Sequence, residues 1–245
     1  MTSTFLLVRE DREYLRAPGE ELQTDLGVLT VPEDVEPGQR LETHLGEEFV
    51  VREPRGPDLF DHFERTGAPM MPRDIGLVIG MTGAAADDRV LDAGTGTGVL
   101  AAYLGRIGAA VRTYEQDPEF ADVARENMRL AGVADRVDVR TGDVTAELDA
   151  LAAERGFDLL TLDTADAPSV VCRAPELLRS GGFVVVYSPF VEGTRTAAEA
   201  AEEAGLTDVV THETIQRRMQ FDERGSRPDT RGVGHTGYLT VGRLS

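Results

Sequence analysis

The run from Asp92 to Gly98, Asp-Ala-Gly-Thr-Gly-Thr-Gly, constrains the fold of this chain more than any other segment. It follows the apolar, strand-like residues Val90 and Leu91 and leads into a helix-like segment that reaches Gly105. Glycines allow the backbone to approach a ligand closely, and the first turn of the following helix offers free N–H groups. This strand–loop–helix unit predicts a ligand at the carboxyl end of a strand in a parallel sheet.

The region after residue 74 alternates apolar runs with amphipathic segments, which is typical of an α/β fold with a parallel sheet. The predicted strands cover residues 89–92, 110–115, 137–140, 157–163 and 182–187. The predicted helices cover residues 72–81, 98–105, 119–130, 174–178 and 194–204. Two more strands are expected to flank Arg217 and Gly237 as an antiparallel pair. The stretch from 224 to 237 is rich in glycine, proline and arginine, and it predicts a long hairpin or loop.

The first part of the chain has a different sequence pattern. Short β-like runs at residues 5–8, 27–31 and 48–51 are separated by turn residues such as Pro18-Gly19 and Pro37-Gly38. We therefore expect an N-terminal β-rich domain over residues 1–68 and a second, α/β domain over residues 69–245.

The charge balance is strongly acidic, with a net charge of −19, and all 25 basic side chains are arginines. This composition favours a protein adapted to high internal salt, where the Debye length falls to about 3 Å and self-repulsion is screened. Because such a surface would be acidic for reasons unrelated to its ligand, the acidity does not exclude a nucleic-acid partner.

Cysteine and histidine usage predicts no structural metal. The single cysteine, Cys172, is expected to be a small buried or half-buried side chain, and the four histidines show no HxxxH spacing. No segment resembles a signal peptide, and no apolar run approaches the roughly 20 residues of a membrane span. We expect a soluble, cytoplasmic protein.

The glycine spacing separates two classes of ligand. Dinucleotide-binding loops prefer G-x-G-x-x-G, whereas here the glycines alternate and an acid ends the strand. This pattern favours S-adenosylmethionine, which carries an amino acid on a sulfonium, over a pyrophosphate; a turn without a ligand is the alternative. The residues expected to bind the cofactor are Asp92, Gly94, Thr95, Gly96, Thr97, Gly98, Glu115 and Asp143.

Three acids stand where successive strands end, so they are expected to converge on one crevice. Glu115 is placed to bind ribose hydroxyls, and Asp143 is placed to accept a hydrogen bond from an adenine amino group. Asp163 ends the fourth strand, where the methyl acceptor would lie. The alternatives are an exposed acid at 115, a helix N-cap at 143 and a turn cap at 163. The segment 177–183 then resembles the helix–turn–strand of the class I methyltransferase fold.

Segments 67–74, 226–228 and 234–239 together resemble the tRNA (adenine-N1)-methyltransferases of archaea and bacteria that act in the T-loop. The resemblance covers essentially the whole chain. It implies a homotetramer that methylates N1 of adenosine 58 of tRNA, with position 57 as a second target in archaeal members. By motif position it assigns Gly94, Gly96, Glu115 and Asp143 to the cofactor and makes Asp163 the catalytic carboxylate.

One departure from the family concerns the turn after Asp163, which usually contains an aromatic residue and ends in Trp. This chain has no Trp and reads Thr-Ala-Asp-Ala-Pro over residues 164–168. The chemistry still fits, because adenine N1 has a lone pair and needs alignment rather than deprotonation. A carboxylate near N1 and N6 would offset the charge that develops on the ring.

The remaining candidates concern tRNA. His235 and Tyr238 are expected either to line the pocket of a flipped-out base or only to pack beside it. Arg217, Arg218 and Arg227 are candidates for phosphate contacts, with solvated surface arginines as the alternative. Since counterion release contributes little in concentrated salt, we expect a local arginine cluster within an otherwise acidic surface.

Two other functions remain open from the sequence. A protein-isoaspartate O-methyltransferase shares the α/β core, but the tail from His235 to Tyr238 and the β-rich start argue against it. A non-catalytic tRNA-binding subunit is the second alternative, and the intact glycine loop and Asp163 argue against that.

Overall fold

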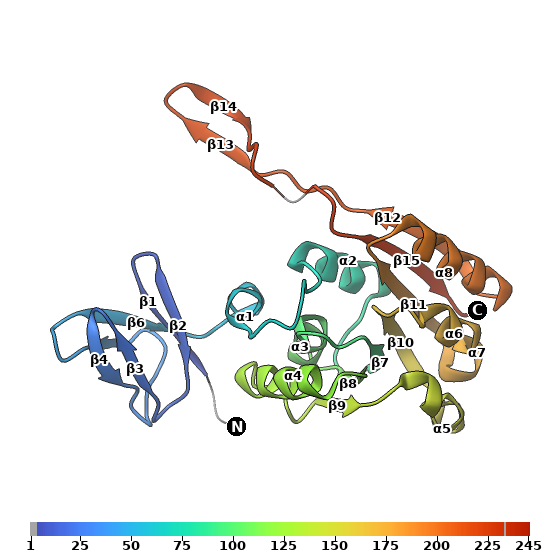
Figure 1. The fold of residues 1–245 in the computed structure, drawn as a ribbon, viewed down its shortest axis with the longest axis horizontal. Helices are drawn as coiled ribbons and strands as arrows, with labels where there is room; N and C mark the ends of the chain where they lie inside the picture. The colour runs from blue at the N-terminus through green and yellow to red at the C-terminus, as the bar shows by residue number, and fades with distance from the viewer. Residues whose placement is uncertain (1–3, 233) are drawn as a thin grey trace.

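The protein has a small β-rich part, a larger α/β part and a projecting arm (Figure 1). The structure is a computed structural model, and it describes residues 4–232 and 234–245. Val233, inside the predicted hairpin stretch, and residues 1–3 of the predicted N-terminal domain lie outside that description. Among the described residues, no helix combines the length and the apolar character that crossing a membrane requires.

The N-terminal part is a four-stranded antiparallel sheet with an added hairpin. The sheet order is β2 (Arg12–Arg16), β1 (Phe5–Arg9), β6 (Glu48–Arg52) and β5 (Arg40–Glu42), and the hairpin joins β3 (Glu21–Thr24) to β4 (Gly27–Thr30). The three predicted strands correspond to β1, β4 and β6. Strands β2, β3 and β5 were not predicted, because charged and polar residues dominate them and each buries at most one side chain.

Strand β1 is buried on both faces. Side chains alternate across a strand, so Phe5 and Leu7 face the core of the N-terminal part, while Leu6 and Val8 face the other way. Leu6 and Val8 join a cluster that includes Leu59 of helix α1 (Gly56–His62) and continues into the α/β part. The two parts therefore share one continuous apolar cluster.

The α/β part is built on a seven-stranded sheet with the order β12-β15-β11-β10-β7-β8-β9. The strands are β7 (Arg89–Ala93), β8 (Ala110–Glu115), β9 (Val137–Thr141), β10 (Phe157–Leu162), β11 (Leu178–Ser188), β12 (Thr207–Glu213) and β15 (Tyr238–Arg243). Strands β11 to β9 run parallel, and β15 is antiparallel to both β11 and β12. This is the α/β, class I methyltransferase arrangement that the sequence predicts, including its final antiparallel pair.

Helices cover both faces of this sheet. They are α2 (Pro72–Thr82), α3 (Val99–Arg106), α4 (Pro118–Leu130), α5 (Leu148–Glu154), α6 (Ala167–Cys172), α7 (Ala174–Leu177) and α8 (Val191–Glu203), with a 3-10 turn η1 (Val144–Glu147). Side chains alternate between the two faces of the sheet, so the core consists of two clusters. Val90 and Leu159 pack with α2, α3 and α4 on one face, whereas Leu91 and Leu160 pack with α5 to α8 on the other. Apolar side chains on both faces explain why the strands read as continuous apolar runs.

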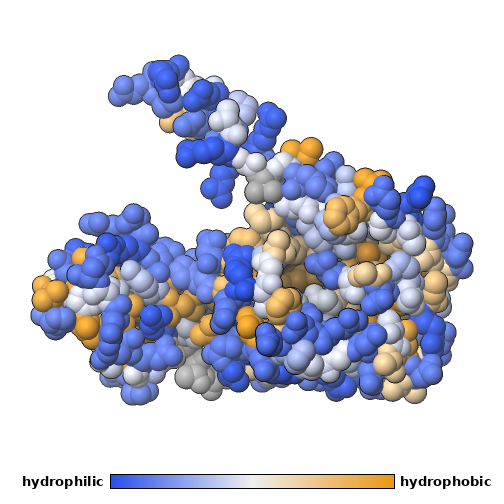
Figure 2. All heavy atoms as spheres, viewed as in Figure 1, coloured by the Kyte–Doolittle hydropathy of each residue, from blue (hydrophilic) through white to orange (hydrophobic). Residues whose placement is uncertain are grey.

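The arm is a two-stranded hairpin of β13 (Met219–Asp222) and β14 (Gly225–Pro228), which projects from the body and is mostly hydrophilic (Figures 1 and 2). The predicted hairpin stretch, 224–237, captures β14 but misses β13. Met219 and Phe221 both stay exposed, so β13 lacks a buried face that would give it a strand pattern.

Candidate active site at the carboxyl edge of the sheet

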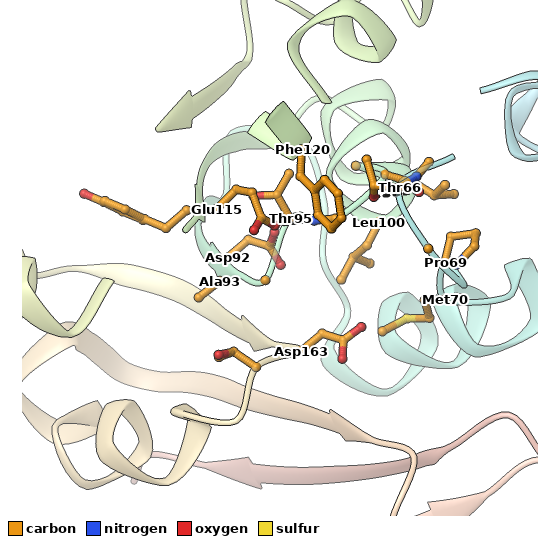
Figure 3. Close-up of a pocket in the computed structure, with 18 of the residues that line it drawn as sticks. Thr66, Pro69, Met70, Asp92, Ala93, Thr95, Leu100, Glu115, Phe120 and Asp163 are labelled. Atoms are coloured by element: carbon orange, nitrogen blue, oxygen red, sulfur yellow. Dashed lines mark hydrogen bonds between the residues drawn. The ribbon is translucent and has the colours of Figure 1, made fainter. Parts of the chain in front are cut away.

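A cavity of ≈ 310 Å³ lies at the carboxyl ends of β7, β8 and β10 (Figure 3). The glycine loop forms one wall, and segment 66–70 between α1 and α2 forms another. The cavity is lined by the cofactor candidates of the glycine loop, residues 92–98, and also by Glu115 and Asp163. The structure therefore brings together side chains that the sequence predicts at the ends of three different strands.

The glycine loop packs directly against the end of β10. Gly94 has φ +86°, and a Cβ at this position would overlap the carbonyl oxygen of Asp163. The Gly94 amide donates to the Tyr114 carbonyl at 3.0 Å. Gly98, with φ +81°, is the N-cap residue of α3. Gly94 is thus required both by its backbone conformation and by the close approach of another strand end.

Asp92 is buried between two neighbouring strands. One of its carboxylate oxygens accepts a hydrogen bond from Thr113 of β8, and the other accepts one from Thr161 of β10. Desolvation raises the pKa of Asp92, and the two hydroxyl donors oppose that rise. Neither threonine was predicted as a site residue, although a Thr in a mostly apolar strand next to a strand that ends in an acid is a usable signal.

Glu115 and Asp143 sit differently at the rim. Glu115 lines the cavity and accepts hydrogen bonds from the Gly96 amide at 2.8 Å and the Asp117 amide at 3.1 Å. Asp143 is exposed and is not a lining residue, although its neighbours Gly142 and Val144 are. It caps η1 by accepting from the Thr145 hydroxyl and amide, which lower its pKa. The capping alternative is present, and the adenine contact of Asp143 stays a prediction.

Asp163 follows β10 directly, and its carboxylate points into the cavity from the side of β10 (Figure 3). The residue is exposed where the cavity opens to solvent, although surrounding protein atoms partly desolvate its carboxylate. This desolvation, together with the negative charge of Asp92, raises the pKa of Asp163 to about 7. Its ionisation is therefore placed in the physiological range.

The raised pKa of Asp163 predicts a pH-dependent cost in stability. Between the ordinary pKa of 3.8 and about 7, the folded chain holds a proton that the unfolded chain releases. The fold is therefore progressively destabilised as the pH rises through this window, and the cost levels off above it. We expect Asp163→Asn to raise the melting temperature, and to raise it more at pH 8 than at pH 5, in thermal unfolding followed by circular dichroism.

Asp143 provides a control of opposite sign. Its pKa is lowered in the folded chain, so its ionised form stabilises the fold above the ordinary pKa. Asp143→Asn should lower the melting temperature at neutral pH. A gain from Asp163→Asn that is the same at pH 5 and pH 8 would contradict the assigned ionisation.

Segments 70–74 and 235–239 meet beside the cavity through a buried polar network. The Arg73 guanidinium donates to the Thr236 hydroxyl at 3.0 Å, and that hydroxyl donates to the Asp74 carboxylate at 2.9 Å. Asp74 is 1% exposed. Gly237 packs against the Tyr187 ring so closely that a Cβ would overlap it. Two motifs about 160 residues apart in the sequence therefore form one structural unit.

Comparison with known proteins decides the family. Residues 64–225 match the family described as tRNA methyltransferase complex GCD14 subunit. The chain belongs to this family. It is 34% identical to a tRNA (adenine(57)-N(1)/adenine(58)-N(1))-methyltransferase of Methanocaldococcus jannaschii, over 96% of this chain and 92% of that protein. It is 30% identical to a tRNA (adenine(58)-N(1))-methyltransferase of Thermus thermophilus, over 84% and 80%.

Solved structures agree in fold. A SAM-dependent O-methyltransferase from Thermotoga maritima superposes with a TM-score of 0.81 at 25% identity, over 99% of this chain and 93% of that one. A tRNA (m1A58) methyltransferase from Aquifex aeolicus gives 0.72 at 23% identity, over 99% and 96%. Both likenesses extend through the N-terminal β-rich part, which is therefore part of the shared architecture.

In this GCD14-family chain, His235 and Tyr238 lie at the base of the arm and are not among the lining residues of the cavity. His235 forms hydrogen bonds to the Pro189 carbonyl at 3.0 Å and to Glu213 at 2.8 Å, and its ring lies 4.9 Å from that of Tyr238. The same two partners raise the pKa of His235. These contacts join the ends of β11, β12 and β15, which supports the packing alternative, and the base-pocket role stays a prediction.

Several other positions differ from expectation or were missed. Arg227 lies on β14 of the arm and Arg217 on the segment that leads into β13, and neither lines the cavity. Phe120, in the first turn of α4, lines the cavity although the sequence gives it no functional pattern. Cys172 is exposed, contrary to the prediction of a buried or half-buried side chain, because it ends α6 on the solvent side. Within residues 4–232 and 234–245, no cluster of three or more His, Cys, Asp or Glu side chains could hold a metal ion.

Proposed function

We propose that the chain transfers a methyl group from S-adenosylmethionine to N1 of an adenosine in the T-loop of tRNA, at position 58 with position 57 as the second candidate. The observation that carries the proposal is the position of Asp163, whose carboxylate faces the cavity of the glycine loop in a member of the GCD14 family. The 34% identical relative is named for both positions.

The residues of the cavity fit S-adenosylmethionine. The cavity volume of ≈ 310 Å³ lies at the lower end of the range for small-molecule sites. At Gly96 the nearest atom to an added Cβ would be 3.8 Å away, so the loop leaves room for a ligand above it. Glu115 would hold the ribose, and the backbone at Gly142 and Val144 would border the adenine, with Asp143 beside it. When bound, the cofactor supplies an electrophilic methyl group.

Asp163 would act on the acceptor base rather than on the cofactor. Its ionised carboxylate accepts a hydrogen bond from the N6 amino group of adenine, which aligns N1 and leaves its lone pair free to attack. The same negative charge offsets the positive charge that develops on the ring during transfer. Because its pKa is about 7, Asp163 is substantially ionised at neutral pH, as this role requires.

The arm is the best candidate for contact with the tRNA backbone. Residues 217–231 contain five arginines and three acids, a local balance of +2 in a chain whose net charge is −19. Within the described residues, Arg217 and Arg218 form no ion pair, whereas Arg224 and Arg231 lie 3.6 Å and 3.8 Å from acids of the arm. This local excess of arginine supports the expectation that tRNA phosphates contact an arginine-rich part of an otherwise acidic surface.

The arm also supports the proposed homotetramer. Ile215, Met219 and Phe221 are 66%, 51% and 74% exposed. Large exposed apolar side chains on a projecting hairpin and on the segment that leads into it are typical of a surface that another subunit covers. A tetramer would also bring several arginine arms to one tRNA. The tRNA substrate further implies a cytoplasmic enzyme.

A direct test is methyl transfer to unmodified tRNA transcripts in concentrated KCl, with radiolabelled S-adenosylmethionine as donor. Primer extension should stop at the T-loop adenosines, because N1-methylation blocks base pairing. Transcripts with position 57 or 58 replaced by guanosine assign the target. Labelled isoaspartyl peptide with no labelled tRNA would instead establish the O-methyltransferase alternative, and the absence of product from either substrate would favour the non-catalytic subunit.

A further inference from the structure

Residues 64–71 cross one side of the cavity between α1 and α2 without regular secondary structure; we call this segment the strap. Five consecutive strap residues, from Thr66 to Met70, line the cavity. In Figure 3, Thr66, Pro69 and Met70 stand along one side of it. The strap is therefore a wall of the cofactor site, although it lies far from the glycine loop in sequence.

Asn127 of α4 lies beneath the junction between the strap and the glycine loop. Its side chain is completely buried. The two N–H groups of its amide donate to the carbonyl oxygens of Glu64, at 3.0 Å, and Thr97, at 2.9 Å. Its Oδ1 accepts from the Glu64 amide at 3.2 Å. One buried side chain thus binds the start of the strap and the glycine loop at the same time.

A second contact joins the same two walls directly. The Thr66 amide donates to the Thr97 hydroxyl at 3.3 Å, and the two threonine hydroxyls lie 3.4 Å apart. Both contacts fall at the N-terminal end of the strap. Its C-terminal end is fixed by buried Met70 and by the Arg73–Thr236 hydrogen bond.

The middle of the strap has no comparable support. Gly67 and Ala68 are exposed, and no atom lies within 4 Å of the position that a Cβ of Gly67 would take. The position of this wall is therefore set by its two ends. Loss of the contacts at the Asn127 end would let the strap move away from the glycine loop.

We propose that Asn127 is a positioning residue for the cofactor: it holds the strap against the glycine loop and thereby slows the release of S-adenosylmethionine. This inference rests on the proposed function, because it takes the cavity as the S-adenosylmethionine site. Asn127 does not line the cavity, so it acts through Glu64 and Thr97 rather than by touching the ligand.

Two variants test the proposal from opposite sides of the junction. Asn127→Asp keeps the size of the side chain but removes its two amide donors, and Thr66→Val removes the hydroxyl on the strap. Thr194→Val is the matched control, since it removes a buried hydroxyl that donates to Phe190 away from the cavity. Should Asn127→Asp fail to fold, Thr66→Val still tests the junction between the strap and the glycine loop, because the half-buried Thr66 contacts Thr97 directly.

The measurements are stopped-flow dissociation of S-adenosylhomocysteine and steady-state kinetics with tRNA. We expect dissociation about tenfold faster for Asn127→Asp and about threefold faster for Thr66→Val, in keeping with the loss of ordinary hydrogen bonds. The KM for S-adenosylmethionine should rise in parallel, while kcat at saturating cofactor stays within about twofold. Thr194→Val should change neither.

Unchanged dissociation in both Asn127→Asp and Thr66→Val, with only a lower melting temperature, would show a merely structural Asn127 and overturn the inference. A wild-type chain that binds no S-adenosylhomocysteine would overturn the proposed function itself, and the inference with it. The wild-type binding measurement separates these two failures.

Discussion

Replacement of Asp163 by alanine is expected to lower kcat for tRNA methylation by at least about 100-fold, the effect of removing one preorganised electrostatic group from a transition state. Affinity for S-adenosylhomocysteine should stay within about threefold, because the glycine loop and Glu115 remain. Single-turnover transfer with labelled cofactor measures the chemical step, and calorimetric titration measures binding. The result would separate a role in alignment of the base from a role in holding the cofactor.

Asp166→Ala is the matched control for this variant. Asp166 lies three residues further along the same turn, and within the described part of the chain its carboxylate accepts a single hydrogen bond, from the exposed Gln116 at 3.2 Å. It is not a lining residue of the cavity. Asp166→Ala should therefore retain wild-type turnover. Near-wild-type activity of Asp163→Ala would remove its catalytic role and leave the acceptor side of the site unassigned.

Gly94→Ala is expected to abolish cofactor binding and to destabilise the fold more than any other single glycine-to-alanine change in the loop. The added Cβ would overlap the Asp163 carbonyl oxygen, which belongs to the backbone and cannot rotate away. The left-handed conformation costs about 1–2 kcal/mol, and overpacking adds about 1–3 kcal/mol. Urea unfolding and titration with S-adenosylhomocysteine measure the two effects.

Gly132→Ala isolates the conformational part of that cost. Gly132 has φ +68°, but no atom lies within 4 Å of an added Cβ. Gly98→Ala is intermediate, because the nearest atom is the flexible Cε of Met128 at 2.7 Å. Equal destabilisation by Gly94→Ala and Gly132→Ala would mean that the loop and β10 can separate without cost, which is incompatible with a rigid cofactor site.

Much of the α/β fold is predictable from the sequence for a physical reason. Its central strands, such as β7 and β10, are buried on both faces, so they appear as apolar runs that are followed by acids. The amino-acid sequence alone therefore places Glu115 and Asp163 at one edge of the sheet. Polar strands such as β2 and β13 lack that signal, since most of their side chains face solvent.

The missed parts of the site depend on contacts between distant segments. Thr113 and Thr161 can donate hydrogen bonds to Asp92 only because β8 and β10 flank β7. Asn127 looks like an ordinary polar residue in a helix until the strap is folded over it. For Asp143, by contrast, the sequence predicts the location, because the residue follows the end of a strand. It does not distinguish a helix cap from a ligand contact.

The two-sided burial of β1 has a consequence for how this protein can be dissected. Leu6 and Val8 supply side chains to the cluster that also contains Leu59 and Phe63. Removal of the β-rich part would expose this cluster, and the detached β-rich part would expose the matching face. The two parts are therefore expected to melt in a single cooperative transition, and neither is a suitable unit for expression by itself.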